Sequence, residues 1–216
     1  MANKGFYPLT AGGRIGWNVV TSMFDVEARN HGYETMPGHA ERYRRADEFI
    51  QVVLGLWDSW ADDALRRDRQ GHPVLFQAGA SEPGRELAAR CAEAIYAVAY
   101  DLPAAQSYYR DIKQRVKAAD REAYVPILRQ LPGRLAAGGG HCTMVGTPGQ
   151  IADRMEHWFR NEGADGFNLM PPSLPGGIED FIEQVVPVLQ SRGLFRTEYQ
   201  GSTLREHLGL VRPGRS

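Results

Sequence analysis

The hydrophobic pattern of the chain changes repeatedly between short apolar runs and a helical period. Runs rich in apolar and β-branched residues predict strands at 14–22, 73–77, 95–99 and 165–171. Between them, apolar residues recur every three or four positions, which predicts helices at 40–60, 86–94, 103–119, 147–159 and 178–190. One of these helices has Thr147 as its expected N-cap, and its expected buried face consists of Ile151, Met155, Trp158 and Phe159. Because parallel strands need helical crossovers, this alternation indicates an α/β fold with a parallel sheet or barrel.

A few segments fit this pattern less well. The run at 124–128 has the composition of a further strand, but Pro126 cannot donate to a ladder, so we expect an edge strand or an irregular segment. The stretches 24–38 and 135–140 are expected to be loops, and the mostly polar tail at 195–216 is expected to lie over the body. Because no repeat or linker interrupts the chain, we expect residues 1–216 to form one domain.

Composition excludes several classes of protein. The chain has 216 residues, enough for one sizeable core, and a net charge of -1 gives no field that would attract nucleic acid or an anionic membrane. No apolar run is long enough to span a bilayer. The two cysteines, Cys91 and Cys142, lie far apart and lack metal-ligand spacing, so we expect a cytoplasmic protein without a disulfide or a metal site.

The turn at 79–84, Gly-Ala-Ser-Glu-Pro-Gly, is the segment most informative about chemistry. It follows an apolar run and precedes a helix, with Ser81 as the expected N-cap and Pro83 in the first turn. Small residues let a ligand approach the backbone, and the free N–H groups and dipole of a helix start favour an anion, most often phosphate. An ordinary strand-to-helix corner explains the same spacing, because such corners recur in every α/β fold.

Several sequence blocks, taken together, point to one protein family. In chain order they are GGRIGWNVVTS at 12–22, HAERY at 39–43 with DEF at 47–49, VLFQAGAS at 74–81, VGTP at 145–148 and DGFNLMPP at 165–172. They resemble the bacterial luciferase-like flavin monooxygenases, and above all the branch of nitrilotriacetate monooxygenase component A and dibenzothiophene sulfone monooxygenase. The segment at 192–199 matches as well, so the resemblance covers nearly the whole chain.

The resemblance implies a (β/α)8 TIM barrel that uses O2 and reduced FMN, supplied by a separate NAD(P)H:flavin reductase, to oxidise a small organic substrate. It implies that His39 and Tyr43 contact the flavin and that Ser81 binds the FMN phosphate. The residue pattern agrees, since His39 and Tyr43 are four positions apart and share one face of a helix. The predicted cofactor-binding set also includes Ala80 beside Ser81, and Asn18 and Thr21 at the end of the strand at 14–22.

More ordinary roles explain some of the same residues. His39 could merely cap its helix, and Tyr43 lies on the apolar stripe, so a core position is equally natural. No Ser-His-Asp order, paired-carboxylate pattern, phosphate-binding Walker loop or zinc motif occurs. We assign no catalytic side chain, because in a flavin enzyme the cofactor carries the oxygen chemistry.

The chain is short for such a barrel. A complete barrel of this class needs about 250 residues, and the resemblance begins at what would be its fourth strand, so we expect a partial or shortened TIM barrel. Exposed strand edges aggregate unless they are paired, which favours a homo-oligomer. Two other functions stay open: a non-catalytic flavin-barrel remnant or assembly partner, and a protein that binds phosphate-bearing ligands without redox chemistry.

Overall fold

The computed structural model describes residues 12–59, 69–121, 125–132, 142–171 and 173–213. Its centre is a curved sheet of five parallel strands in the order β1-β2-β3-β4-β5. The strands are β1 (Gly16–Val19), β2 (Val74–Ala78), β3 (Ala94–Ala97), β4 (Ile127–Pro132) and β5 (Gly166–Met170). Neighbours in the sheet are also neighbours along the chain, as in a TIM barrel, so the predicted fold class of a partial barrel is confirmed.

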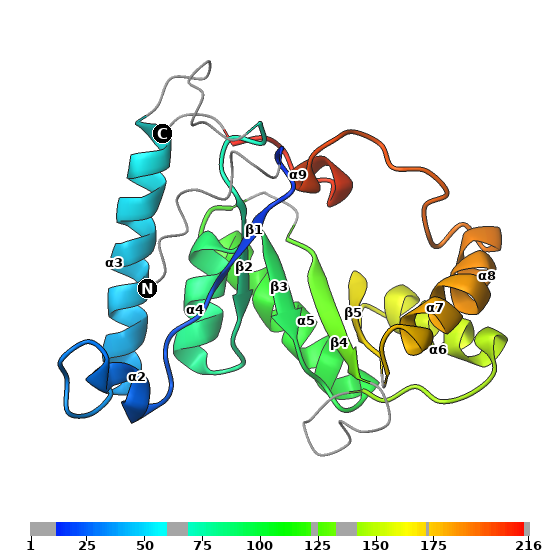
Figure 1. Cartoon of the computed structure of the whole chain (residues 1–216), viewed down its shortest axis with the longest axis horizontal. Coiled ribbons are helices and arrows are strands. Elements are labelled where there is room, and N and C mark those ends of the chain that lie inside the picture. The colour runs from blue at the N-terminus through cyan, green and yellow to red at the C-terminus, as the bar shows by residue number, and fades with distance from the viewer. Residues whose placement is uncertain (1–11, 60–68, 122–124, 133–141, 172, 214–216) are drawn as a thin grey trace.

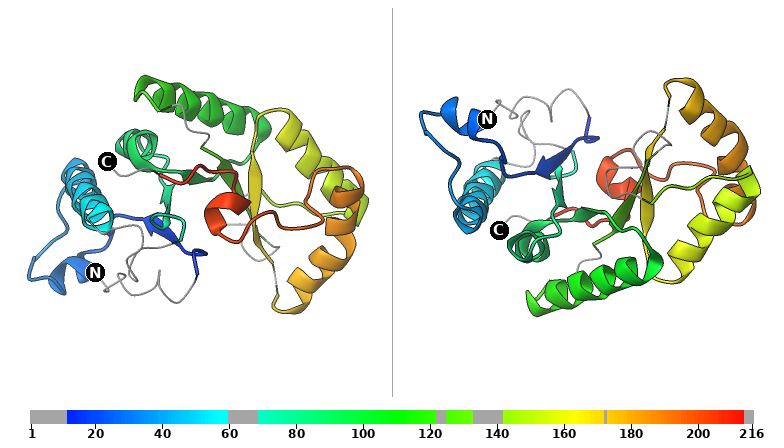
Figure 2. Two further views of the ribbon diagram at one scale, coloured as in Figure 1. Left: turned by 90° about the horizontal axis from the view of Figure 1, so that it is seen from above. Right: turned by 90° about the horizontal axis from the view of Figure 1, so that it is seen from below.

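Helices connect the strands and lie in an arc around the convex side of the sheet (Figures 1 and 2). They are α2 (Asp25–Arg29), α3 (His39–Asp58), α4 (Glu82–Cys91), α5 (Leu102–Ala118), α6 (Pro148–Arg160), α7 (Gly176–Asp180), the π-helical η3 (Phe181–Val185) and α8 (Val186–Ser191). The short α9 (Leu204–His207) lies on the concave side instead. The strands all point toward the edge at which α3 begins. In parallel α/β folds this carboxyl edge of the sheet holds the ligand.

The core forms between the convex face of the sheet and its helices. Ile95 and Ile127 on the sheet and Ile112 on α5 are fully buried in one cluster. One face of α5, with Tyr108, Ile112 and Val116, is buried. Leu75 and Val19 pack in a second cluster against α3 and α4. These layers position the starts of α3 and α4 side by side at the carboxyl edge.

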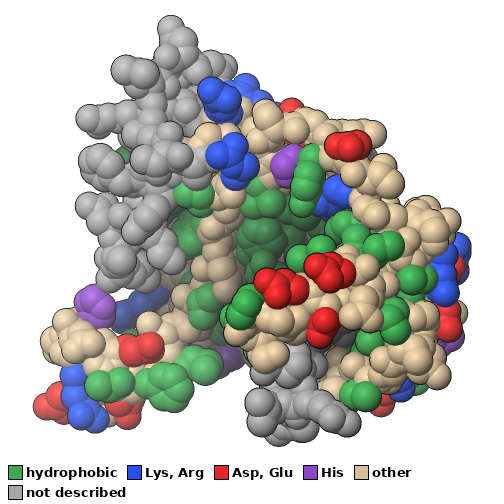
Figure 3. All heavy atoms as spheres, turned by 45° about the vertical axis from the view of Figure 1, so that its right-hand side comes forward, with side chains coloured by type: hydrophobic (Ala, Val, Ile, Leu, Met, Phe, Trp, Pro, Cys, Tyr) green, Lys and Arg blue, Asp and Glu red, His purple; other side chains and the backbone are tan. Residues whose placement is uncertain are grey.

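The concave face is closed at one end by the C-terminal tail. Phe76 and Tyr96 stack there with ring centroids 5.1 Å apart, and three leucines of the tail, Leu204, Leu208 and Leu210, pack in their cluster. Hydrophobic side chains gather in the hollow of the molecule seen in Figure 3. The prediction that the tail lies over the body is confirmed: its half-buried leucines cover apolar strand residues that would otherwise face water.

Three sequence predictions need correction. Pro126 does not place its segment at an edge: it precedes β4, which pairs with β3 and β5, so no ladder bond within β4 needs its missing N–H. The stretch at 24–38, expected to be a loop, contains α2. Phe159, expected on the buried face of α6, is 47% exposed, whereas Trp158 beside it is buried. The segment 135–140 lies outside the described residues.

Cys91 illustrates how this core affects stability. Burial raises the pKa of its thiol to about 11, and its Sγ donates to the carbonyl oxygen of Leu87 at 3.2 Å. In the unfolded chain a cysteine ionises near pH 8.5. The folded form therefore gains stability from the neutral thiol below that pH and loses it as the pH rises toward 11, because only the unfolded state then releases the proton.

We expect the unfolding free energy of the wild type to fall with pH by about 1.4 kcal/mol per unit more than that of Cys91→Ala between pH 9 and 11. Urea titrations of both proteins at several pH values measure this difference. Parallel pH profiles for the two proteins would contradict it.

Candidate functional site

The candidate site begins at the turn that follows β2. Ser81 is the N-cap of α4, with an extended backbone, and its Oγ accepts a hydrogen bond from the Gly84 N–H at 3.3 Å. The predicted cap is thus confirmed, although α4 begins earlier than the pattern indicated. Gly79 and Gly84 close this turn on each other, because a Cβ added to either would stand 3.2 Å from the Cα of the other. This close approach of two backbone segments requires glycine at both positions, and it holds the end of β2 against the start of α4.

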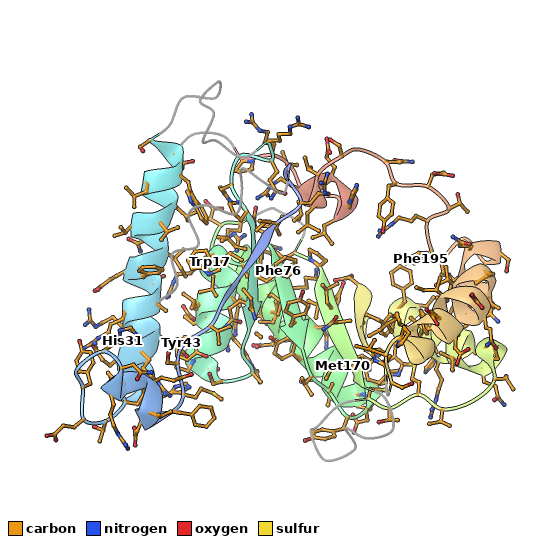
Figure 4. All side chains as sticks on the ribbon, viewed as in Figure 1. Trp17, His31, Tyr43, Phe76, Met170 and Phe195 are labelled. Carbon is orange, nitrogen blue, oxygen red and sulfur yellow. The ribbon has the colours of Figure 1, made fainter. Side chains whose placement is uncertain are left out.

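Tyr43, from α3, reaches the same turn. A Cβ added to Gly84 would lie 3.1 Å from the Tyr43 Oη and 3.1 Å from the Ser81 Oγ. Both hydroxyl oxygens lie 3.1 Å from this one point, so the distance between them is at most twice 3.1 Å. A Cβ on Gly79 would also meet the Tyr43 Oη, at 3.3 Å. Figure 4 shows Tyr43 between the start of α3 and the carboxyl edge of the sheet.

His39 lies next to Tyr43 on α3. It is the first residue of the helix, and its ring centroid lies 4.9 Å from that of Tyr43 at an angle of 51°. The imidazole is exposed, while Tyr43 is half-buried. An imidazole, a phenol and a serine hydroxyl therefore follow one another from α3 to the start of α4. All three can donate hydrogen bonds to an anion.

Side chains of α4 and α5 donate hydrogen bonds to backbone carbonyl groups of the turn at 79–84. Tyr108 Oη donates to the Gly79 carbonyl oxygen at 3.2 Å, and Arg85 Nε donates to the Ala80 carbonyl oxygen at 2.9 Å. Arg85 also pairs with Asp111 at 3.1 Å, which balances its charge locally. The turn is thus fixed from one side, and its attraction for an anion comes mainly from hydroxyls, N–H groups and the helix dipole.

A cluster of paired charges lies on the first turns of α3. Hydrogen bonds from Arg44 and Arg45 lower the pKa of Glu41 to about 2, so this carboxylate stays ionised. The Arg45 Nε lies 2.7 Å from Glu41 Oε1. Because the negative charge is matched by two guanidinium groups, it opposes an anion near His39 only weakly.

The other predicted site residues do not join this cluster. Ala80 lies in the turn and is exposed, with only its backbone positioned by Arg85. Asn18 pairs with Phe76 in register and, by alternation along β1, faces the concave side, opposite to Trp17 and Val19. Thr21 follows the end of β1 and is half-buried. The structure therefore brings His39, Tyr43 and Ser81 together. It places Asn18 on the other face of the sheet and Thr21 beyond the end of β1.

Gln77 is a polar residue of this region that sequence reasoning did not single out. It is 2% exposed in the middle of the sheet, and its Oε1 is buried without a hydrogen-bond partner among the described residues. Its Nε2 lies 2.7 Å from the point where a Cβ would stand on Gly79. The available signal was an amide within the otherwise apolar run at 74–78.

A cavity of about 290 Å3 lies elsewhere, at the carboxyl end of β5. Its lining combines the starts of α6 and α7 with η3, and includes Met144, Ile151, Leu169, Met170, Phe181 and Val185. None of the predicted site residues lines it. Among the described residues, no group of three or more His, Cys, Asp or Glu side chains could hold a metal ion, and no helix is long and apolar enough to cross a membrane.

Comparison with known proteins gives consistent results. The sequence model of the luciferase-like monooxygenase family matches residues 9–131. Nitrilotriacetate monooxygenase component A of Aminobacter aminovorans is 34% identical over 318 residues, which cover 94% of this chain and 70% of that protein. The matched region is longer than the 216 residues of this chain, so the relative carries additional residues within it.

Solved structures agree with the sequence comparison. EDTA monooxygenase from Chelativorans sp. BNC1 superimposes with a TM-score of 0.84 at 30% identity, covering 94% of this chain and 72% of that one. A riboflavin lyase, solved with modified FMN and riboflavin, superimposes with a TM-score of 0.78 at 26% identity over 91% of this chain and 68% of that one. These relatives are named as enzymes, and the resemblance noted in the sequence is confirmed. The chain belongs to the luciferase-like monooxygenase family.

Proposed function

We propose that the protein is an FMNH2-dependent monooxygenase that oxidises a small organic substrate with O2. The observation that carries this proposal is the meeting of the Tyr43 and Ser81 hydroxyls over Gly84, at the start of α4 and beside His39. Family membership supplies the reaction class, and this cluster supplies a place where a phosphate-bearing cofactor fits.

The residues present fit the phosphate of FMN. A helix start favours negative charge, and the hydroxyls of Ser81 and Tyr43 lie beside the start of α4. In the proposed site Ser81 and Tyr43 bind the phosphate, and His39 donates from the solvent side. When bound, reduced FMN supplies the electrons that activate O2. The protein's own contribution is to orient the cofactor and to shield it from water.

The remaining predicted residues stay in the proposed site with smaller roles. Ala80 contributes backbone at the turn, and a larger side chain there would crowd a bound phosphate. Asn18 and Thr21 lie at the same carboxyl edge, and we assign them to the part of the cofactor beyond its phosphate. No side chain is assigned the role of a nucleophile or a general base.

The proposed reaction needs partners. Reduced FMN would come from a separate NAD(P)H:flavin reductase, and the printed name of the nitrilotriacetate relative, component A, fits a system of more than one protein. We propose a cytoplasmic location, because the unpaired thiols Cys91 and Cys142 are typical of a reducing compartment.

The open sheet favours a second possibility. The described sheet has five strands, whereas a closed barrel of this class has eight, so β1 and β5 each have an edge without a strand partner among the described residues. We propose that the protein self-associates. A flavin-barrel remnant that serves only as an assembly partner would share this property. Size-exclusion chromatography with light scattering decides the point, and a stable monomer at micromolar concentration would contradict self-association.

Flavin titration tests the proposed function. Purified protein is titrated into FMN and into riboflavin, and the change in flavin fluorescence gives both dissociation constants. We expect FMN to bind at least about tenfold more tightly than riboflavin, because hydrogen bonds to a charged group contribute about 1.5–3 kcal/mol. Tyr43→Phe, which keeps the ring, is expected to lose most of that preference.

Turnover distinguishes the enzyme from the remnant. Reduced FMN from an added flavin reductase should support O2-dependent oxidation of an organic substrate by the holoprotein. Failure to bind FMN at high micromolar concentration would refute the flavin site itself. Tight FMN binding without oxidation of any compound in a broad substrate panel would favour the remnant.

A further inference from the structure

The cavity at the carboxyl end of β5 has the size and lining of a small-molecule site. Its walls include Ile151 of α6, Leu169 of β5 and Val185 of η3, which also belong to the core cluster between these three elements. The cavity therefore continues a well-packed apolar core toward the surface. Its volume of about 290 Å3 is close to the lower end of the range for ligand pockets, about 300–1,000 Å3.

A π-helical turn forms one wall of this cavity. In η3 the Val186 N–H donates to the carbonyl oxygen of Phe181, five positions earlier, instead of four as in an α-helix. The wider turn ends just before Pro187, which has no N–H to continue a regular ladder. Such turns are rare and are frequently found at functional sites. This one contributes Phe181, Gln184 and Val185 to the lining.

The charge of the lining has one sign. Asp180 ends α7, and its Oδ1 accepts a hydrogen bond from Gln184 Nε2 at 3.4 Å. Both side chains line the cavity and are exposed, so they lie toward its mouth. No lysine, arginine or histidine is among the described residues that line it. A ligand that places a cation at this mouth is therefore attracted, and an anion is repelled.

The volume and the remaining lining limit the body of the ligand. An apolar cavity of about 150 Å3 is large enough to bind benzene. This cavity is about twice as large, so it has room for one six-membered ring with a short substituent. Two methionines of the lining, Met144 and Met170, have flexible side chains that adapt to the shape of a ligand. Met170 is 36% exposed at the end of β5, where Figure 4 labels it, so the cavity is open to solvent there.

We propose that this cavity is a binding site for a small aromatic or aliphatic amine. The apolar walls bury the hydrocarbon body, and the Asp180 carboxylate pairs with the ammonium group at the mouth. Carboxylates of the same shape are excluded by the same charge. The site is separate from the proposed flavin site, since none of the predicted cofactor-binding residues lines it. Its occupation does not depend on FMN.

Three probes of similar shape test the site: benzylamine, benzyl alcohol and benzoate, which are cationic, neutral and anionic at neutral pH. The protein is labelled with carbon-13 at its methionine methyl groups and titrated without flavin. The NMR signals of Met144 and Met170 report on the cavity, and those of Met23 and Met36, which do not line it, are internal controls. We expect benzylamine to bind with a dissociation constant of about 1 mM or less. It should bind at least about tenfold more tightly than benzoate, with benzyl alcohol between them.

Two variants separate the charge from the space. Asp180→Asn keeps the shape and can still accept from Gln184, and we expect it to lower the preference for benzylamine over benzoate about fivefold, with benzyl alcohol unchanged. Glu48→Gln removes a negative charge from an ion pair on α3 and should leave all three affinities unchanged. Met170→Trp fills the mouth of the cavity and should abolish binding of all three probes. Thermal unfolding checks that each variant is folded.

Several results would overturn the proposal. If millimolar probe left the Met144 and Met170 signals unchanged, or moved those of Met23 and Met36 equally, the cavity would not be a site. If benzylamine and benzoate bound equally, the selection by Asp180 would be wrong. Unaltered binding by folded Met170→Trp would place the probes elsewhere. Failure of FMN to bind would refute the proposed function and leave this site standing, because the probes are measured without flavin.

Discussion

Ser81→Asp is expected to lower the affinity for FMN at least about a hundredfold while the protein stays folded. Aspartate is as good an N-cap as serine, and its charge suits the positive end of a helix. The α4 start should therefore keep the capping bond that Ser81 now accepts from Gly84. The same carboxylate would stand where the phosphate dianion is proposed to bind, and the two negative charges would repel each other in a partly desolvated site.

Ser81→Asn is the matched control for this experiment. It has nearly the same shape as aspartate and caps equally well, but it carries no charge. We expect it to bind FMN within about tenfold of the wild type. Riboflavin, which lacks the phosphate, should bind to all three proteins alike. Fluorescence titration gives the affinities, and thermal unfolding confirms that the variants are folded. Equal loss of FMN and riboflavin binding in Ser81→Asp would show that the phosphate does not lie at α4.

Arg205→Met is expected to destabilise the protein by about 3 kcal/mol, because it removes the guanidinium partner of the Glu93 carboxylate, whose side chain is only 15% exposed. Arg205 is 2% exposed, and its Nη2 lies 2.9 Å from Glu93 Oε2. The guanidinium also donates to the carbonyl oxygens of Gln70 at 3.1 Å and Val211 at 3.2 Å. These bonds fasten the tail across the beginnings of β2 and β3, at the end of the sheet away from the proposed site.

A surface arginine provides the comparison for Arg205. Arg192 pairs with Asp153 at 2.7 Å and with Glu156 at 3.0 Å, but its side chain is 30% exposed. Arg192→Met should cost about 1 kcal/mol or less, since water already solvates both charges. Urea unfolding of the two variants measures the difference. Similar small losses for both would mean that the Glu93 pair is not a main attachment of the tail. A partial recovery in Arg205→Met/Glu93→Gln would support the unpaired charge as the cause.

Local sequence patterns predicted most of the elements because each depends on near neighbours. The helical period over α3 placed its ends within two residues, and Ser81 and Thr147 were correctly identified as N-caps. Each cap acts on an N–H three positions along the chain, so its signal is contained in a few letters. The order of strands and helices likewise follows from short-range periodicity, and it was sufficient to predict a parallel α/β fold.

Predictions failed where distant parts of the chain meet. The position of the tail over the body was predicted, but the contacts of its leucines with the cluster of Phe76 and Val74 were not, because these residues lie more than a hundred positions earlier in the chain. Phe159 fits the helical stripe of α6, but it is 47% exposed. Pro126 has the composition of an edge residue, and only the ladder from β3 to β5 shows that it precedes an interior strand.

The candidate site divides in the same way. The residues alone predicted the turn at 79–84 and the helical spacing of His39 and Tyr43, because backbone conformation and the direction of side chains along a helix are local properties. Tertiary structure alone decided that the Tyr43 and Ser81 hydroxyls meet over Gly84, that Asn18 faces another side of the sheet, and that the buried Gln77 amide lies beside Gly79. Those relations depend on how α3 and α4 pack across β2, and packing brings together residues that no sequence interval connects.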